Sequence, residues 1–171
     1  MEQFTKVTFA MIKPDAIIAR NSGKIIDIIE QNGFEIIRMQ KVILAPDLAE
    51  EFYEVHKDRP FYKELVDFVT SGPVIVMALY KDNAITSWRD LIGATDPAKA
   101  AEGTIRNTFG TSVGNNAVHG SDSSETALSE LGLFFPELFE DDRVDNESSD
   151  EEDDCCDEDE DCDNSCENTD V

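Results

Sequence analysis

The distribution of charge along the chain most strongly limits what it can fold into. Residues 141–171 contain 17 acidic side chains and a single basic one, Arg143, so this segment carries −16 of the chain's formal charge of −24. Apolar residues are almost absent from it, and such a segment cannot bury enough surface to offset the entropy lost on ordering. We therefore expect one folded domain over residues 1–140 and a disordered acidic tail over residues 141–171.

The cysteines and the N-terminus indicate the compartment. The four cysteines all lie in the acidic tail, at Cys155, Cys156, Cys162 and Cys166. They cannot crosslink the predicted domain, which therefore needs no oxidising compartment. The first residues lack the basic and apolar segments of a signal peptide, and no stretch approaches the roughly 18 apolar residues of a membrane span. We expect a cytoplasmic protein without membrane contact.

The tail cysteines allow two interpretations. Lying among carboxylates, they could bind a soft or borderline metal, but their spacing matches no standard zinc pattern. A flexible acidic segment needs no ligand, so a solubilising or partner-binding role is favoured. The sequence does not identify the partner of the tail.

Periodicity predicts the elements in the first half of the domain. Residues 4–12 alternate as in a strand with one buried face, residues 22–32 have the spacing of a helix, and residues 35–43 return to a strand. Two helices follow. Asp47 forms a plausible capping box with Glu50 at the start of the first, and the second runs from Pro60 to Gly72, so we expect a helical hairpin.

The second half completes the predicted fold. Residues 74–80 form a continuous apolar run bounded by turn residues, which predicts a central strand. A helix capped by Asn83, a short strand over residues 117–119 and a helix over residues 122–131 with Asp122 in its first turn follow. This order fits an α+β domain with a ferredoxin-like split βαβ, in which helices cover one face of a four-stranded antiparallel sheet.

His119 is the strongest candidate for chemistry. It lies in the run Asn116-Ala117-Val118-His119-Gly120-Ser121-Asp122, just before the predicted helix. An imidazole is a nucleophile, and the free amide groups at a helix start attract an anion. Glu130, farther along the helix, could fold back to fix the tautomer and orientation of the imidazole. Because a lone histidine is more often structural, a phosphate-accepting role depends on the rest of the site.

Phosphoryl transfer also needs cations that hold the phosphate oxygens. The domain offers Lys13, Arg89 and Arg106, the last in a Gly, Thr and Pro-punctuated connection over residues 93–115 that is longer than most loops. Without a resemblance to guide the choice, each of these cations could equally be a solvated surface charge.

Other nucleotide and metal motifs are missing from residues 1–140. They contain no GxxxxGK[ST] loop, no HExxH and no CxxC, and Ser22-Gly23-Lys24 is too short to stand for a phosphate loop. His56 is expected to have a structural or loop-binding role. Any metal is expected to arrive as Mg²⁺ on the phosphates of a nucleotide, with no metal-ligating side chain in the protein.

The run around His119 is similar to the NxxHGSD active-site signature of nucleoside diphosphate kinases, and the resemblance covers about residues 5–139. Further matching stretches are Met11-Ile12-Lys13-Pro14-Asp15, Arg59-Pro60-Phe61-Tyr62, Ser71-Gly72-Pro73-Val74, Gly93-Ala94-Thr95-Asp96-Pro97 and Gly103-Thr104-Ile105-Arg106. The resemblance implies a ping-pong transfer of the terminal phosphate from a nucleoside triphosphate to a nucleoside diphosphate through a phosphohistidine at His119, which maintains triphosphate pools. The acidic tail has no counterpart in the family pattern.

The resemblance also implies roles for individual residues. Glu130 would orient His119 and Ser121 would support it, and Lys13 would act in both catalysis and binding. The residues implied to contact phosphates or sugar hydroxyls are Lys13, Tyr53, Arg89, Thr95, Arg106 and Asn116. Phe61 and Val113 would sandwich the base, with Leu65 also in the binding site. Contact with the faces of a base, rather than its edges, implies broad base tolerance.

The resemblance implies a homo-oligomer as well. Family members form tetramers or hexamers, and Asp96-Pro97 in the long connection favours a hexamer. We expect no specific nucleic-acid partner. The alternative is an oligomeric scaffold or interaction protein that has kept the kinase fold and uses its acidic tail. Loss of His119 or of an arginine would have favoured that alternative, and neither is lost.

Overall fold

The computed structural model describes residues 6–139. The predicted disordered tail, with its cysteines, lies outside the described residues. Within them, no helix is long and apolar enough to cross a membrane.

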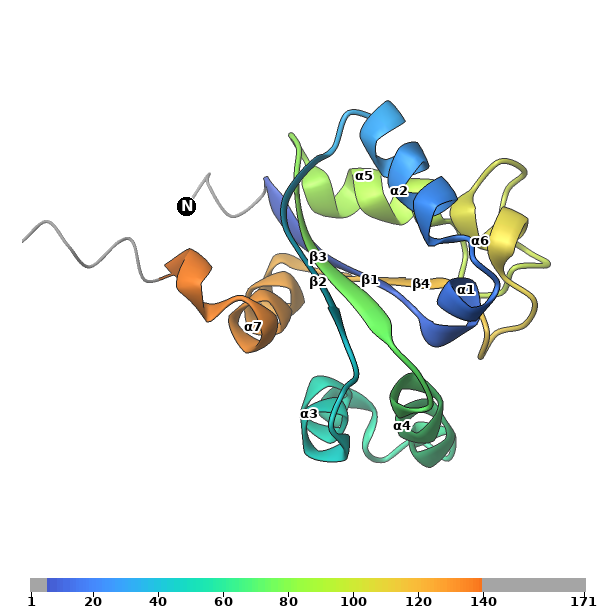
Figure 1. Cartoon of the computed structure of the whole chain (residues 1–171), viewed down its shortest axis with the longest axis vertical. Helices are drawn as coiled ribbons and strands as arrows, with labels where there is room; N and C mark the ends of the chain where they lie inside the picture. The colour runs from blue at the N-terminus through green and yellow to red at the C-terminus, as the bar shows by residue number, and fades with distance from the viewer. Residues whose placement is uncertain (1–5, 140–171) are drawn as a thin grey trace, which may run out of the picture. The chain divides into compact units, whose positions relative to one another are not determined.

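Strands and helices follow the predicted order (Figure 1). The strands are β1 (Val7–Ile12), β2 (Glu35–Val42), β3 (Val74–Tyr80) and β4 (Val118–Gly120). The α-helices are α1 (Pro14–Ile18), α2 (Ser22–Gln31), α3 (Pro46–Phe52), α4 (Tyr62–Thr70), α5 (Ala84–Ile92), α6 (Ile105–Phe109) and α7 (Ser124–Phe134). Two 3₁₀ turns, η2 (Glu54–His56) and η3 (Pro136–Phe139), complete the set.

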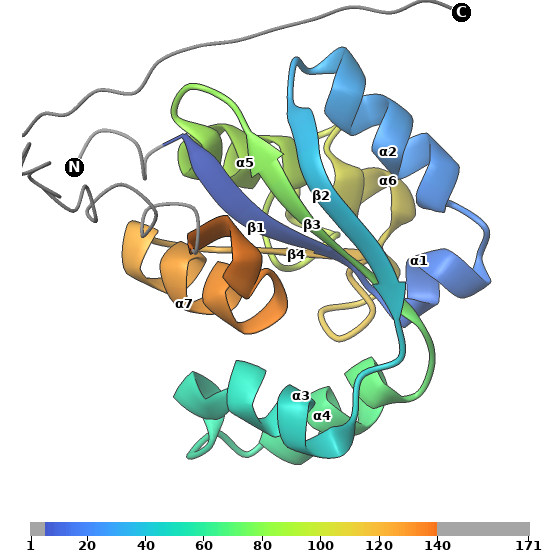
Figure 2. The same ribbon diagram turned by 60° about the vertical axis from the view of Figure 1, so that its left-hand side comes forward.

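The strands form one antiparallel sheet in the order β2-β3-β1-β4. β3 lies between β2 and β1, and of its residues only Tyr80 is exposed, which confirms the predicted central strand. β4 pairs with β1 so that His119 lies opposite Met11. The connectivity is that of the predicted ferredoxin-like fold, which is confirmed. α3 and α4 lie side by side in both views, as the predicted hairpin (Figures 1 and 2).

Helices pack against both faces of the sheet, so the prediction of one covered face was wrong (Figure 2). On one face, residues of α2 and α5, among them Trp88, share a core cluster with Ala10 and Ile12 of β1. On the other face, residues of α3, α4 and α7 share a second cluster with Phe9 and Met11. β1, which pairs with the strand that carries His119, therefore lies between two apolar layers.

β1 is buried on both sides, unlike the strand with one buried face that its alternation predicted. Phe9 and Met11 face one cluster, and the intervening Thr8, Ala10 and Ile12 have no exposed surface either. A strand covered on both faces needs no polar side. The alternating pattern gave the wrong prediction of one exposed face because small residues such as Thr and Ala fit a buried position as well as an exposed one.

Two short helices were not predicted from the sequence. α1 and α6 each contain five residues, too few for an apolar period to be visible. α6 lies within the connection over residues 93–115, so part of that segment has regular structure. It carries Arg106, which is buried despite its charge.

The start of α3 differs from the prediction. The helix begins at Pro46 with Ala45 as its N-cap, and Asp47 makes no side-chain cap with Glu50. Proline suits the first helical position because its ring fixes φ and its missing N–H would have no partner there. The proline therefore sets the start in place of the expected capping box.

The start of α7 also differs. The helix begins at Ser124, so Asp122 lies before the first turn in which it was predicted. The N-cap is Ser123, whose hydroxyl accepts a hydrogen bond from the Thr126 amide at 3.2 Å. The Thr126 hydroxyl accepts in return from the Ser123 amide at 3.0 Å, which makes a reciprocal capping box. This cap fixes the beginning of the helix that carries Glu130.

Candidate active site

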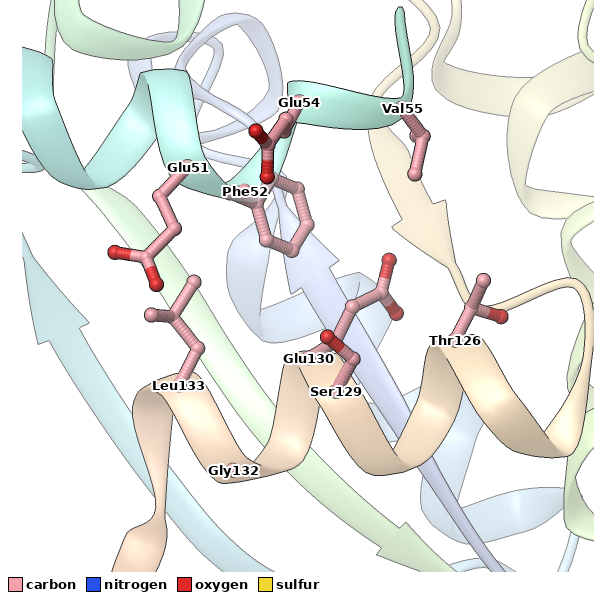
Figure 3. A pocket seen from close by; sticks show the side chains of 9 residues that line it. All are labelled: Glu51, Phe52, Glu54, Val55, Thr126, Ser129, Glu130, Gly132 and Leu133. Carbon is pink, nitrogen blue, oxygen red and sulfur yellow. The ribbon is translucent and has the colours of Figure 1, made fainter.

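His119 and Glu130 meet between β4 and α7. His119 Nε2 lies 2.8 Å from Glu130 Oε1, and the Ser121 hydroxyl donates to Glu130 Oε2 at 2.5 Å. The Glu130 side chain projects from α7 toward Phe52 and η2 (Figure 3). Because a carboxylate accepts hydrogen bonds, its contact with Nε2 places the imidazole proton on that nitrogen. The lone pair of the neutral ring is then on Nδ1, which makes no side-chain hydrogen bond within residues 6–139.

Aromatic rings surround the imidazole. The ring centroid of Phe52 lies 5.0 Å from that of His119, and those of Phe9 and Tyr53 lie at 6.1 and 6.3 Å. The rings limit the rotation of the imidazole and exclude water from part of its surface. Phe9 and Phe52 were not predicted as site residues, because their apolar spacing marks only a core position.

Tyr53 presents a buried hydroxyl in this site. The side chain is 3% exposed, and its hydroxyl has no hydrogen-bond partner in the described part of the chain. Burial, and next the charge of Glu130, hold the pKa of Tyr53 well above its usual value. The group therefore stays a neutral hydroxyl that is available to donate to an anionic ligand.

The backbone of β4 is fixed by Trp88. The indole Nε1 donates to the His119 carbonyl oxygen at 3.3 Å. Gly120 follows directly, and a Cβ there would overlap Trp88 Nε1 and Cδ1. Glycine in the signature thus permits the close approach of the indole.

A chain of hydrogen bonds joins Lys13 to the long connection. Lys13 Nζ donates to Asn116 Oδ1 at 2.8 Å, and Asn116 Nδ2 donates to the Thr95 carbonyl at 3.1 Å. Burial lowers the pKa of Lys13 to about 8; the charge of Arg106 lowers it too, and that of Asp15 acts in the opposite sense. A phosphate placed here would favour the protonated ammonium.

Arg106 is a second buried cation. Its Nη1 donates to the Gly93 carbonyl at 3.0 Å and its Nη2 to the Val118 carbonyl at 3.1 Å. Its Nε is buried and has no hydrogen-bond partner among the described residues. No carboxylate in residues 6–139 forms a salt bridge with Arg106. Burial, followed by the nearby charge of Arg89, lowers the pKa of Arg106 to about 10. A buried charge without a counterion suits an anionic ligand.

The chain turns sharply before β4. Ala117 has φ of 67°, and the Val118 amide donates to the Asn116 carbonyl at 2.8 Å, which closes a three-residue turn. Asp15 Oδ2 accepts a hydrogen bond from the Ala117 amide at 3.0 Å, and the Lys13 amide donates to the Ala117 carbonyl at 2.9 Å. Asp15 was not predicted as a site residue, although it lies in a stretch that matches the family.

The residues predicted to bind the base and sugar lie on separate segments. Phe61 is 49% exposed at the start of α4, and Val113 is 57% exposed in the long connection. Leu65 is half-buried and packs against a core cluster. The Thr95 side chain is exposed, and only its carbonyl takes part in the hydrogen-bond chain to Lys13.

A hollow of about 390 Å³ lies beside Glu130, between α3 with η2 and α7 (Figure 3). Its lining residues are Glu51, Phe52, Glu54, Val55, Thr126, Ser129, Glu130, Gly132 and Leu133. Three of them are glutamates and none is a cation, so the hollow does not suit phosphate oxygens. Lys13 and Arg106 do not line it.

The donor set does not suit a metal held by the protein alone. Among residues 6–139, no three or more His, Cys, Asp or Glu side chains gather where they could hold a metal ion. Lys13, Arg89 and Arg106 are positively charged, which suits phosphate oxygens and does not suit a metal cation. The site therefore fits a metal that brings nucleotide phosphates as its own ligands.

Known sequences match this domain over nearly its full length. The family model for nucleoside diphosphate kinase matches residues 6–139. A nucleoside diphosphate kinase of Geotalea daltonii is 54% identical over 131 residues, which are 77% of this chain and 96% of that protein. One of Oleidesulfovibrio alaskensis is 52% identical over 128 residues, or 75% and 92% of the two chains.

Solved structures share the fold. The nucleoside diphosphate kinase of Aquifex aeolicus superposes with a TM-score of 0.76 at 43% identity, covering 78% of this chain and 96% of its own. A halophilic nucleoside diphosphate kinase of Halobacterium salinarum, in complex with CDP, has a TM-score of 0.74 at 38% identity, with 77% and 88% covered. The family model spans most of the chain and the sequence relatives are more than half identical to it. This chain therefore belongs to the nucleoside diphosphate kinase family.

Proposed function

We propose that this chain transfers the terminal phosphate of a nucleoside triphosphate to a nucleoside diphosphate through His119. The observation that carries the proposal is the 2.8 Å contact between His119 Nε2 and Glu130, which leaves the Nδ1 lone pair for attack. In the first step Nδ1 bonds to the terminal phosphorus, the bond from phosphorus to the bridging oxygen breaks, and the diphosphate leaves with the electron pair. In the second step a terminal oxygen of another diphosphate attacks the phosphohistidine and releases Nδ1.

Glu130 stabilises the imidazole during this transfer. The ring gains positive charge when Nδ1 bonds to phosphorus, and the carboxylate then accepts a charge-assisted hydrogen bond from Nε2. The proton stays on Nε2 in both steps, so no separate base is required. Ser121 holds the second carboxylate oxygen and keeps Glu130 in place.

The buried donors hold the phosphates. Lys13 and Arg106 supply positive charge, and Arg89 adds to it from α5. Arg106 Nε and the Tyr53 hydroxyl are buried donors without partners in the described residues, and both are suited to phosphate oxygens. Asn116 orients the Lys13 ammonium. These donors stabilise the charge that develops on the transferred group.

The exposed apolar side chains bind the base. Phe61 and Val113 contact its two faces, Leu65 adds apolar contact and Thr95 contacts a sugar or phosphate oxygen. Contact with the faces does not discriminate among bases, which accounts for broad base tolerance. The exposure of Phe61 and Val113 supports their availability to a ligand.

The divalent cation of the reaction is Mg²⁺, held by the nucleotide phosphates without a protein ligand. When bound, it would neutralise part of the phosphate charge. The cationic donor set around Lys13 and Arg106 supports this arrangement.

The active form is a homo-oligomer, with a hexamer favoured by Asp96-Pro97 in the long connection, and it acts in the cytoplasm. Residues 1–140 form the kinase domain and residues 141–171 a separate tail. The end of the family match at residue 139 supports this boundary. Truncation after Phe139 is expected to leave turnover largely intact; a collapse in turnover would assign the tail to the catalytic unit.

Labelling with γ-³²P-ATP tests the central proposal. The chain has two histidines, which provide a matched pair: His119→Ala should abolish an acid-labile protein phosphate, and His56→Ala should retain it. The label on the wild type should pass to added GDP. A wild type that takes up no label, or a His119→Ala variant that labels equally, would exclude the phosphohistidine and favour the scaffold alternative.

A further inference from the structure

We infer that Asp15 is a positioning residue of the phosphohistidine site: its carboxylate holds the Ala117 peptide in the turn that precedes His119 and keeps a negative charge close to the Lys13 ammonium. This inference rests on the proposed function, because it concerns how the same site is held. Among residues 6–139, Asp15 makes no hydrogen bond or salt bridge with His119, so it would act through Ala117 and Lys13.

The turn at Ala117 needs an external support. A positive φ of 67° is uncommon for an alanine, and a three-residue turn with that φ is a strained form for any residue with a Cβ. Such backbone persists only where its surroundings fix it. Val118 and His119 directly follow Ala117 in the chain, so relaxation of the turn would displace the nucleophile.

Asp15 and Lys13 hold both sides of this turn. Asp15 Oδ2 accepts from the Ala117 amide at 3.0 Å, and the Lys13 amide donates to the Ala117 carbonyl at 2.9 Å. Asn116, the first residue of the turn, accepts a hydrogen bond from the Lys13 ammonium at 2.8 Å. Because residues 13–15 contact residues 116–117 through backbone and side chains together, a change at Asp15 reaches the nucleophile and the phosphate-binding cation at once.

The second oxygen of Asp15 points to an electrostatic role. Asp15 Oδ1 is buried and has no hydrogen-bond partner among residues 6–139, so hydrogen bonding alone does not account for a carboxylate at this position. Its charge favours the protonated form of Lys13, against burial and the charge of Arg106. The other ionisable groups of the site are Arg89 on α5, His119 on β4, Glu130 on α7 and Tyr53 after α3. Asp15 therefore raises the pKa of Lys13 in a site whose burial lowers it.

Two variants separate the two roles. In Asp15→Asn, the amide oxygen can still accept from the Ala117 amide, so the turn is kept while the charge is lost. We expect less than about a ten-fold loss of phosphohistidine formation at pH 7, and a shift of the alkaline limb of kcat/KM to lower pH by about one unit. In Asp15→Ala, both roles are lost, and the displaced histidine should slow phosphorylation about 100-fold.

A rescue variant tests the turn directly. Glycine adopts a positive φ without steric cost, so Asp15→Ala/Ala117→Gly should recover about ten-fold of the rate that Asp15→Ala loses. Ala117→Gly in the wild-type background measures the effect of the substitution alone, and the interaction between the two sites follows from the double-mutant cycle. A glycine at a positive φ can also stabilise the fold in general, and that effect is present in both backgrounds, so only the interaction term reports the support of the turn by Asp15.

The measurement includes a readout that does not need turnover. Acetylation of Lys13 by acetic anhydride, followed by mass spectrometry as a function of pH, reports the protonation of its amine in the full-length protein. The half-point should move to lower pH in Asp15→Asn. An unmoved half-point together with an unchanged alkaline limb would overturn the electrostatic role, and an Asp15→Ala rate that is unchanged, or not rescued by Ala117→Gly, would overturn the positioning role.

Failure of the proposed function is distinguishable from failure of this inference. If the wild type forms no phosphohistidine, the proposed function fails, and the Lys13 titration still decides whether Asp15 acts on that amine. If the wild type labels and the Asp15 variants match it in every readout, only this inference fails. Should Asp15→Ala not fold, Asp15→Asn and its Lys13 titration keep the inference testable.

Discussion

Gly120→Ala should destabilise the domain because the glycine lies against a buried indole. A Cβ at position 120 would overlap Trp88 Nε1 and Cδ1 and would lie 3.3 Å from Ile92 Cδ1. Trp88 has no exposed surface and Ile92 is 1% exposed, so neither side chain can move into solvent. The clash cannot be relieved without displacing the helix α5 or the strand β4.

The magnitude follows from two terms. Overpacking in a filled core costs about 1–3 kcal/mol. The hydrogen bond from Trp88 Nε1 to the His119 carbonyl would be lost or lengthened, which removes about 1 kcal/mol. We therefore expect a loss of about 2–4 kcal/mol in the free energy of unfolding, together with slower phosphorylation, because the displaced backbone is that of His119.

Urea unfolding at fixed protein concentration measures this loss. Trp88 is the single tryptophan of the chain, so its fluorescence reports directly on the perturbed contact. Gly132→Ala is the matched control: Gly132 is exposed in α7, and a Cβ there meets no atom within 4 Å. That variant should gain about 0.5–1 kcal/mol, the usual advantage of alanine over glycine in a helix.

The two glycines should therefore respond in opposite directions. If Gly120→Ala unfolds within about 0.5 kcal/mol of the wild type, the close approach of the indole does not constrain this position, and the account of the signature glycine is wrong. If both variants lose stability equally, the effect belongs to glycine replacement in general and not to the contact with Trp88.

Three further predictions concern the site and its helix. Glu130→Gln should slow phosphorylation of His119 by roughly 10- to 150-fold in a single-turnover assay, since it removes a charge-assisted hydrogen bond worth about 1.5–3 kcal/mol; an unchanged rate would exclude a role for the carboxylate charge. The kcat/KM of the wild type should fall as pH rises through about 8, where the buried Lys13 loses its proton, and Lys13→Arg should move that limb to higher pH; a limb that stays in place belongs to another group. Ser123→Ala should cost about 1 kcal/mol in urea unfolding by removing the cap of α7, whereas a loss below about 0.3 kcal/mol would show that the cap is not needed.

The fold was largely predictable because its long elements have clear periods. The central strand over residues 74–80 and the helix over residues 22–32 match the structure closely. The prediction that helices cover only one face of the sheet was wrong at β1, where Thr8 and Ala10 are buried although neither is strongly hydrophobic. Small residues are tolerated inside and outside, so their identity alone cannot tell whether a helix covers them.

The structure brings together three residues that the sequence had singled out, His119, Ser121 and Glu130, since β4 leads into α7; their catalytic roles stay predictions. The support from Asp15 and Trp88 was not foreseen. Asp15 lies 102 residues before the amide that it contacts, and Trp88 lies 31 residues before its acceptor. No local pattern encodes such a separation.

The sequence by itself determined the extent of the acidic tail, the order of the main elements and the family signature, since these are local properties of composition and spacing. Only the tertiary structure decided which groups meet. The pairing of β1 with β4 places Lys13 and Asp15 beside Asn116 and Ala117, and Lys13, Asn116 and Ala117 are buried there. Burial then lowers the pKa values of Lys13 and Arg106, because the cost of a buried charge depends on its surroundings in space and not on its neighbours in sequence.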